Sequence, residues 1–144
     1  HIAEGPAVGA SATLLHSAGC YAGCPTPRDV MQLLLLSNSR APDGGYLTFC
    51  RDALAAQMQG VHKALFVPFA GVSLSWDDYC AQVQAAIAHT GVQLVGAHQD
   101  DALGQFLAGD IQAVIVGGGN TFQLLAECRK RGWLVRIGDA VRSG

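Results

Sequence analysis

The sequence predicts an α/β three-layer sandwich, in which helices cover both faces of a mainly parallel, doubly wound sheet. Three observations predict this fold. From Met31 onward, short apolar runs alternate with segments of helical periodicity, as in βαβ units. The apolar runs are hydrophobic almost throughout, which is typical of parallel strands covered on both faces. Glycine and proline signals separate the elements, and the length of 144 residues suits one domain.

The strands are predicted from four apolar runs, which are residues 32–37, 64–69, 92–96 and 111–116. Each run has the length of a strand, which is too short for a typical helix. Pro68 indicates that the second strand ends near it, because proline cannot donate a hydrogen bond to a sheet ladder. The sheet should be mainly parallel, since helical segments connect the runs through right-handed crossovers.

Helices are expected in the segments between and after these strands, at 46–59, 75–91, 101–108, 122–131 and 133–142. In the first, apolar residues recur at helical spacing. The second begins at Ser75, a favourable N-cap, with Asp77 and Asp78 as ordinary charges in its first turn. It ends at Gly91, because glycine adopts the left-handed conformation that terminates helices.

The ends of the predicted strands indicate where a ligand would bind. In open α/β sheets, ligands bind beyond the carboxyl ends of the strands. The segments that follow these ends are 37–40, 70–76 and 117–121. We therefore expect Ser37, Ala70 and Gly117 to lie at the same edge of the sheet.

Composition and charge exclude several classes of function. Half of the residues are hydrophobic and 14% are charged, which is not the profile of a disordered chain. The net charge is -2, and basic residues cluster only at 129–131, so no nucleic-acid partner is expected. No apolar run approaches the ~20 residues of a membrane span, and residues 1–15 lack the features of a signal peptide.

The cysteines predict reduced thiols in a cytoplasmic protein. Their number is five, which is odd, and their spacing is irregular, so a disulfide framework is not expected. His16, Cys20 and Cys24 would share one face of a helix, but no fourth ligand accompanies them. We expect neither a metal site nor a cofactor.

The segment 117–121, Gly-Gly-Gly-Asn-Thr, follows a strand and opens a helix. Glycine allows the backbone to turn sharply and to approach a ligand closely. Free N–H groups at the start of the helix would favour an anion or a developing oxyanion. The alternative interpretation is a tight turn that binds nothing. Trp76 has two interpretations as well, as part of a pocket rim or as a packing residue.

Four segments carry a resemblance to a known family. They are SNS (37–39), PFAGV (68–72), WDDY (76–79) and VGGGNTFQLL (116–125), and together they resemble the peptidase E, or α-aspartyl dipeptidase, family. The resemblance covers residues 31–144. It implies a class I glutamine amidotransferase-like fold and a cytoplasmic serine hydrolase that cleaves dipeptides with an N-terminal aspartate.

The resemblance also implies roles for particular residues. Gly118 or Gly119 would supply an oxyanion-hole amide, which agrees with the interpretation of the glycine-rich turn. Asn120, Thr121 and Trp76 are the candidate substrate-binding residues. The implied partner is a small dipeptide, with no metal, cofactor, nucleic acid or membrane, and a homo-oligomer is compatible with this function.

The first thirty residues resemble a different part of the same family. Ser17-Ala18-Gly19, followed by Cys24-Pro25-Thr26 and Arg28, is similar to the segment at and after the family's nucleophile, although Leu15 stands where the elbow's first glycine belongs. Ser17 is thus a candidate nucleophile, and 12–15 could be the strand before it. On this interpretation residues 31–144 are the N-terminal half of a peptidase E-like domain, whose own elbow would follow Gly144.

Three explanations of residues 1–30 stay open: a rearranged relative, a segment of a larger arrangement, or a stretch unrelated to function. None of the histidines has the context of the family's catalytic histidine, and only His98 is expected at the carboxyl edge. The rival to a dipeptidase is a non-catalytic domain of the same fold. It would bind a small acidic ligand at the glycine turn or contribute half of a site to an oligomer.

Overall fold

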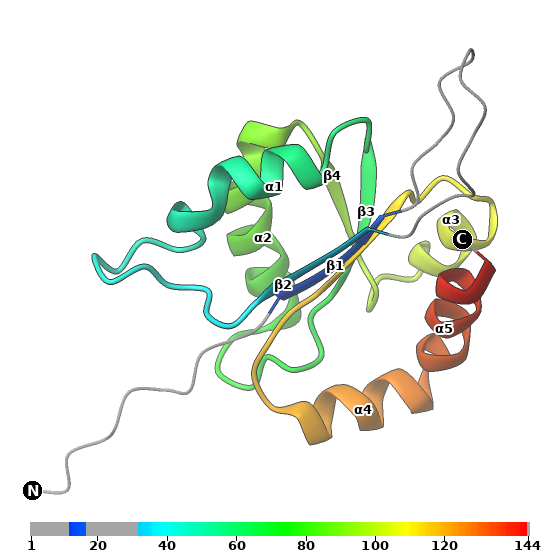
Figure 1. Cartoon of the computed structure of the whole chain (residues 1–144). Coiled ribbons are helices and arrows are strands. Elements are labelled where there is room, and N and C mark those ends of the chain that lie inside the picture. The colour runs from blue at the N-terminus through cyan, green and yellow to red at the C-terminus, as the bar shows by residue number, and fades with distance from the viewer. Residues whose placement is uncertain (1–11, 17–31, 144) are drawn as a thin grey trace, which may run out of the picture.

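A computed structural model of the chain describes residues 12–16 and 32–143. The described residues form one five-stranded sheet with the strand order β2-β1-β5-β3-β4 (Figure 1). The strands are β1 (Ala12–His16), β2 (Gln32–Leu36), β3 (Lys63–Val67), β4 (Gln93–Gly96) and β5 (Ala113–Val116). The predicted strands are therefore confirmed, including the short one before Ser17.

Four of the five strands run in one direction. β3 pairs in parallel with both β4 and β5, whereas β1 is antiparallel to β2 and to β5. β2 consequently runs the same way as β3, β4 and β5. The prediction of a mainly parallel α/β sheet is confirmed, with β1 as the single reversed strand among those described.

The helices are α1 (Arg51–Gln57), α2 (Trp76–Ile87), α3 (Ala102–Leu107), α4 (Thr121–Lys130) and α5 (Trp133–Ser143). Two short 3₁₀ helices, Thr48–Cys50 and Ala88–Thr90, precede α1 and follow α2. The helix expected from residue 46 starts later, because Leu47 adopts the left-handed conformation (φ 55°), which interrupts a right-handed helix. None of the described helices is both long and apolar enough to cross a membrane.

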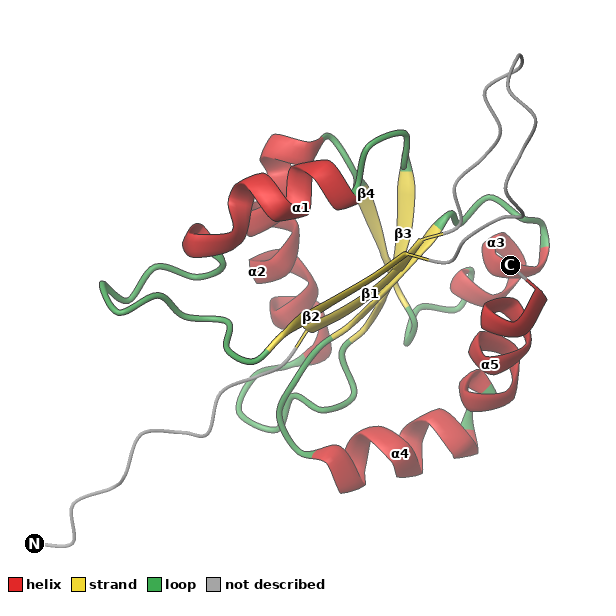
Figure 2. Cartoon of the chain, viewed as in Figure 1, coloured by secondary structure: helices red, strands yellow, loops and turns green. Residues whose placement is uncertain are grey.

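The helices form two layers, one on each face of the sheet (Figures 1 and 2). Side chains alternate between these faces along each strand. In β3, Ala64 and Phe66 join a core with α1 and α2, whereas Leu65 and Val67 join a core with α3, α4 and α5. All four side chains are fully buried. The three-layer arrangement explains why this strand is a continuous apolar run.

β2 departs from that pattern. Leu34 and Leu36 face the core beneath α1 and α2, but Leu33 is 48% exposed and Leu35 is 68% exposed. The apolar run at 32–37 predicts a strand covered on both faces, and this is wrong within the described part of the chain. The helices α3, α4 and α5 pack on the other end of the sheet and leave this stretch open.

The carboxyl ends of the parallel strands meet at one edge of the sheet. In the strand register Val67 of β3 lies beside Val116 of β5, which lies opposite Thr13 of β1. Ala12, the neighbour of Thr13, lies opposite Leu36 of β2. Ser37, Ala70 and Gly117 follow these ends, so the prediction that they share one edge is confirmed.

Candidate active site

The glycine turn, residues 117–120, connects β5 to α4 at this edge. The Gly117 N–H donates to the Val67 carbonyl at 3.0 Å and continues the sheet ladder, and the Asn120 N–H donates to the Ala70 carbonyl at 2.8 Å. Gly119 has a φ of 138°, which side chains rarely adopt, and a Cβ there would collide with the Ala70 carbonyl oxygen. The turn therefore needs glycine at 119 for both its conformation and its contact.

Two backbone donors of the turn are open. Among the residues that the structure describes, no oxygen accepts a hydrogen bond from the N–H of Gly118 or Gly119. Gly119 is exposed and Gly118 is half-buried. Both precede the first turn of α4, where aligned peptide dipoles give a partial positive charge. The arrangement can bind an anion or stabilise a developing oxyanion.

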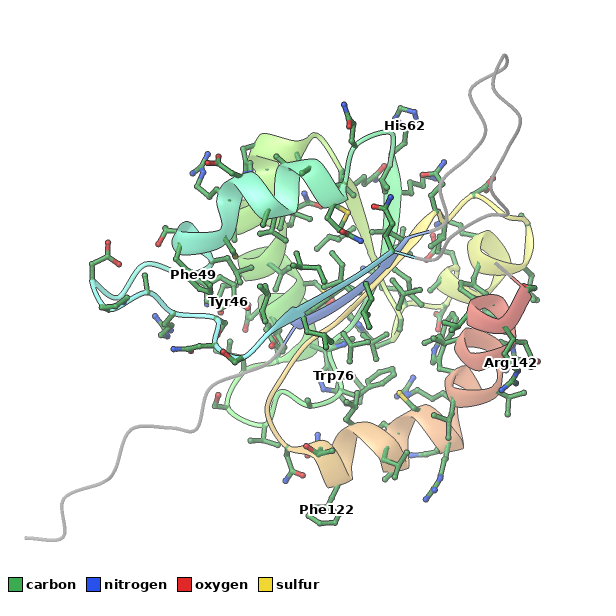
Figure 3. The ribbon with its side chains drawn as sticks, viewed as in Figure 1. Tyr46, Phe49, His62, Trp76, Phe122 and Arg142 are labelled. Carbon is green, nitrogen blue, oxygen red and sulfur yellow. The ribbon has the colours of Figure 1, made fainter. Side chains whose placement is uncertain are left out.

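The residues after the turn begin α4. The side-chain oxygen of Asn120 accepts a hydrogen bond from the Gln123 N–H at 3.1 Å and so caps the helix. Thr121 is exposed, and Phe122 is 88% exposed and points away from the body of the molecule (Figure 3). Capping accounts for the asparagine, and the substrate-binding roles of Asn120 and Thr121 stay predictions.

A narrow cavity lies beside the glycine turn, on the face that α1 and α2 cover. Its lining is apolar except for a few polar groups, and it comprises Leu36, Ser39, Tyr46, Leu47, Leu54, Phe66, Tyr79, Val83, Ile87, Ile115, Gly117 and Gly118. The Tyr79 hydroxyl donates a hydrogen bond to the Gly118 carbonyl at 3.1 Å. Burial raises the pKa of Tyr79 and raises the pKa of Tyr46 well above its usual range. Both hydroxyls therefore stay protonated and able to donate.

Trp76 lies on the opposite face of the sheet. Its half-buried ring (Figure 3) packs edge-on against Phe69, with ring centroids 5.1 Å apart. The ring lies 5.9 Å from the ring of His98. The Arg131 guanidinium lies over the Trp76 ring at 5.0 Å, within the range of a cation–π contact. These contacts account for Trp76 as a packing residue. Its place at a pocket rim stays a prediction.

His98 forms a pair with an acid that the sequence did not reveal. Its Nε2 lies 2.9 Å from Asp77 Oδ1, and the exposed fractions of the two side chains are 12% and 83%. The buried Nδ1 has no hydrogen-bond partner in the described part of the chain. A Cβ on Gly96 would lie 2.8 Å from this Nδ1, so the free nitrogen lies against β4.

That orientation bears on catalysis. A general base must reach the proton that it removes, and the free nitrogen of His98 points into the protein instead of toward the glycine turn. Burial, and secondarily the Asp77 charge, raises the pKa of Cys80 to about 11, so this thiol is protonated at neutral pH. Ser75 caps α2 as the sequence predicts, because its Oγ accepts a hydrogen bond from the Asp78 N–H at 3.1 Å and donates one to the Asp78 carboxylate at 2.7 Å.

Ser17 lies outside the described residues. His16, the residue before it, ends β1 and lies opposite Ala113, the first residue of β5. The glycine turn follows the other end of β5. β1 therefore runs from the edge with the glycine turn toward the opposite edge.

The sheet and the glycine turn define an α/β protein with two open backbone amides at its carboxyl edge. Comparison with known proteins gives the family. The model of peptidase family S51 matches residues 33–144, and the chain belongs to this family.

Relatives with the name Peptidase E agree with this assignment. The chain is 48% identical over 115 residues to Peptidase E of Escherichia coli strain 536 and, equally, to that of Escherichia coli strain K12 / DH10B. The aligned part is 79% of this chain and 49% of each relative. The chain thus spans about half the length of the curated relatives it matches.

Proposed function

We propose that the glycine turn is the oxyanion-binding element of a dipeptidase, and that the reaction is hydrolysis of dipeptides with an N-terminal aspartate. The observation that carries this proposal is the pair of open N–H groups at Gly118 and Gly119, at the start of α4. Membership of peptidase family S51 favours hydrolysis over binding alone. Asn120, Thr121 and Trp76 are the proposed substrate-binding residues.

The chemistry is acyl transfer to a serine. Attack on the peptide carbonyl converts its oxygen into an oxyanion, and an amide donor of the turn would stabilise that charge in the transition state. Removal of one such donor typically lowers kcat about 100-fold or more. The nucleophile and base carry out the proton transfers, and the mechanism requires no metal or cofactor.

Ser17 is the proposed nucleophile, within a segment 1–30 that corresponds to the region at and after the family's nucleophile. Residues 31–144 correspond to the N-terminal half of the domain. β1 itself leads away from the glycine turn, so a serine from a second copy is one way to supply the nucleophile. A homo-oligomer would then complete the site. Cys50, Cys80 and Cys128 are free thiols, which suits the proposed cytoplasmic location.

Ligand binding tests the turn directly. The ¹⁵N-labelled chain is titrated with the dipeptide Asp-Leu, and with Leu-Leu as the control that lacks the aspartate. We expect Asp-Leu to shift the amide signals of Gly118 and Gly119, and Gly119→Val to abolish the shift, because its side chain would collide with Ala70. Signals that do not move with either peptide would contradict the proposal.

Hydrolysis tests the serine. The isolated chain should cleave Asp-Leu weakly or not at all, because no described histidine is placed to act as base at the turn. If Ser17 is the nucleophile, a serine-directed acylating reagent labels it, and Ser17→Ala abolishes both labelling and residual turnover. Robust hydrolysis that survives Ser17→Ala would rule out this serine.

A further inference from the structure

Tyr79 is held in one orientation next to the glycine turn. The residue is 6% exposed, and its ring packs edge-on against Phe66, with the centroids 5.0 Å apart and an interplanar angle of 87°. A Cβ at Gly117 would lie 2.9 Å from the Tyr79 ring, so the backbone of the turn lies directly against it. With the ring fixed on two sides, its hydroxyl meets the Gly118 carbonyl at 3.1 Å.

This hydrogen bond determines the direction of the next N–H. The peptide unit between Gly118 and Gly119 is planar and trans, so its carbonyl and its N–H point in opposite directions. When Tyr79 holds the Gly118 carbonyl toward α2, the Gly119 N–H points away from α2, to the open side of the turn.

Without such a hold, this peptide unit could rotate. Glycine stands on both sides of it and accepts conformations that other residues avoid. A rotated peptide would present the Gly118 carbonyl where the N–H had been, and a carbonyl oxygen repels an anion. A fixed donor stabilises developing charge best, because it needs no reorganisation during the reaction.

Tyr46 lines the same cavity as Tyr79. Burial is the largest influence on the pKa of Tyr79 and raises it, and a hydrogen bond with the Tyr46 side chain lowers it. The Arg40 guanidinium lies 6.0 Å from the centre of the Tyr46 ring, toward the surface. Tyr46 is therefore a second side chain of this cavity that can contact the Tyr79 hydroxyl.

We propose that Tyr79 is a positioning residue, which locks the Gly118–Gly119 peptide with its N–H directed outward for a ligand, and that Tyr46 assists it. The catalytic consequence rests on the proposed function. The orientation of the peptide does not, and it can be tested without any turnover.

The test compares the unaltered chain with Tyr79→Phe, which removes only the hydroxyl, and with Tyr46→Phe, which removes the hydroxyl of the assisting residue. In the unaltered chain the Gly119 amide should be rigid, with an NMR order parameter near 0.85, and in Tyr79→Phe it should fall below about 0.6. The Gly118 carbonyl carbon signal should move in the same variant. Tyr46→Phe should have a smaller effect of the same sign.

Two results would overturn the proposal. One is a mobile Gly119 in the unaltered chain, which does not depend on whether the variant folds. The other is a folded Tyr79→Phe chain with unchanged Gly118 and Gly119 signals. Titration with Asp-Leu separates this proposal from the proposed function. If the Gly119 amide is rigid and loses order in Tyr79→Phe, the role of Tyr79 is supported. If the same chain binds no dipeptide, the dipeptidase site is refuted. Where turnover is measurable, Tyr79→Phe should lower kcat about 10-fold and leave KM unchanged.

Discussion

The Ala70 carbonyl accepts a hydrogen bond from the Asn120 N–H at 2.8 Å and lies directly against Gly119. This contact joins the loop after β3 to the turn after β5. It places a carbonyl on one side of the turn, while Tyr79 holds the other side through Gly118. The two open amides therefore lie on a backbone fixed from both directions, as a preorganised donor site requires.

Gly119→Ala should destabilise the fold by about 1–3 kcal/mol, because an L-residue is strained at a φ of 138° and its Cβ meets the Ala70 carbonyl. Gly104→Ala is the matched control. Gly104 lies within α3, and a Cβ there meets nothing within 4 Å. This control should be neutral or more stable by up to about 1 kcal/mol. Urea unfolding of both variants measures the difference, and equal stabilities would refute the strain.

Ser75→Ala should lower the free energy of unfolding by about 1 kcal/mol, the usual value for an N-cap. Ser75 Oγ accepts a hydrogen bond from the Asp78 N–H at 3.1 Å and donates one to the Asp78 carboxylate. Ser75→Thr retains the hydroxyl and should retain most of the stability. Thermal unfolding followed by circular dichroism distinguishes the two variants. A Thr variant as unstable as the Ala variant would argue against capping.

Trp133→Phe should cost about 1–3 kcal/mol, because it leaves a buried carbonyl without its donor. The indole N–H of Trp133 donates to the Ala97 carbonyl at 2.9 Å, and the residue is 3% exposed. Trp76→Phe removes a half-buried indole and should cost less. The urea concentrations at the unfolding midpoints of the two variants test this, and the midpoint of Trp133→Phe should be the lower. The reverse order would contradict the assignment of Trp133 to the core.

Alkaline pH should destabilise the protein. The pKa of Cys80 is raised from 9.0 to about 11, so between these values the folded chain binds more protons than the unfolded chain. The free energy of unfolding then falls as pH rises from about 9 to 11. Because the thiol is only half-buried, screening by solvent limits the effect to about 1 kcal/mol.

Cys80→Ala should flatten this part of the pH profile of the melting temperature. The raised pKa values of Tyr46 and Tyr79 also lower the free energy of unfolding as pH rises, but at higher pH. Cys80→Ala does not remove these two tyrosines, so their contribution persists in the variant. A profile between pH 9 and 11 that is identical in Cys80→Ala would assign the loss of stability to other groups.

Much of the fold and part of the site could be predicted, because their signals are local. Apolar runs identify the strands, and the glycines of 117–119 mark the turn at the end of β5. The start of α1 was predicted too early, since the left-handed Leu47 gives no sign in the sequence. The exposed face of β2 was missed for a related reason: an apolar run does not tell which faces are covered.

The side-chain contacts around the site could not be predicted, because they join distant segments. Asp77 and His98 are 21 positions apart, and Tyr79 and Gly118 are 39 apart. These pairs meet because the start of α2 lies next to the ends of β4 and β5. The WDDY segment (76–79) contributes to the family resemblance, but its sequence does not indicate which residues Asp77 and Tyr79 contact.

The positions of Trp76 and Trp133 allow tryptophan fluorescence to report on one part of the structure at a time. The sequence contains two tryptophans, and Trp133 on α5 is buried while Trp76 at the start of α2 is half-buried. In the Trp76→Phe chain the remaining tryptophan fluorescence comes from Trp133, whose indole N–H donates a hydrogen bond to the Ala97 carbonyl after β4. A red shift of that emission would then report release of the C-terminal helix from the sheet, even under conditions where the far-ultraviolet spectrum keeps its helical signal.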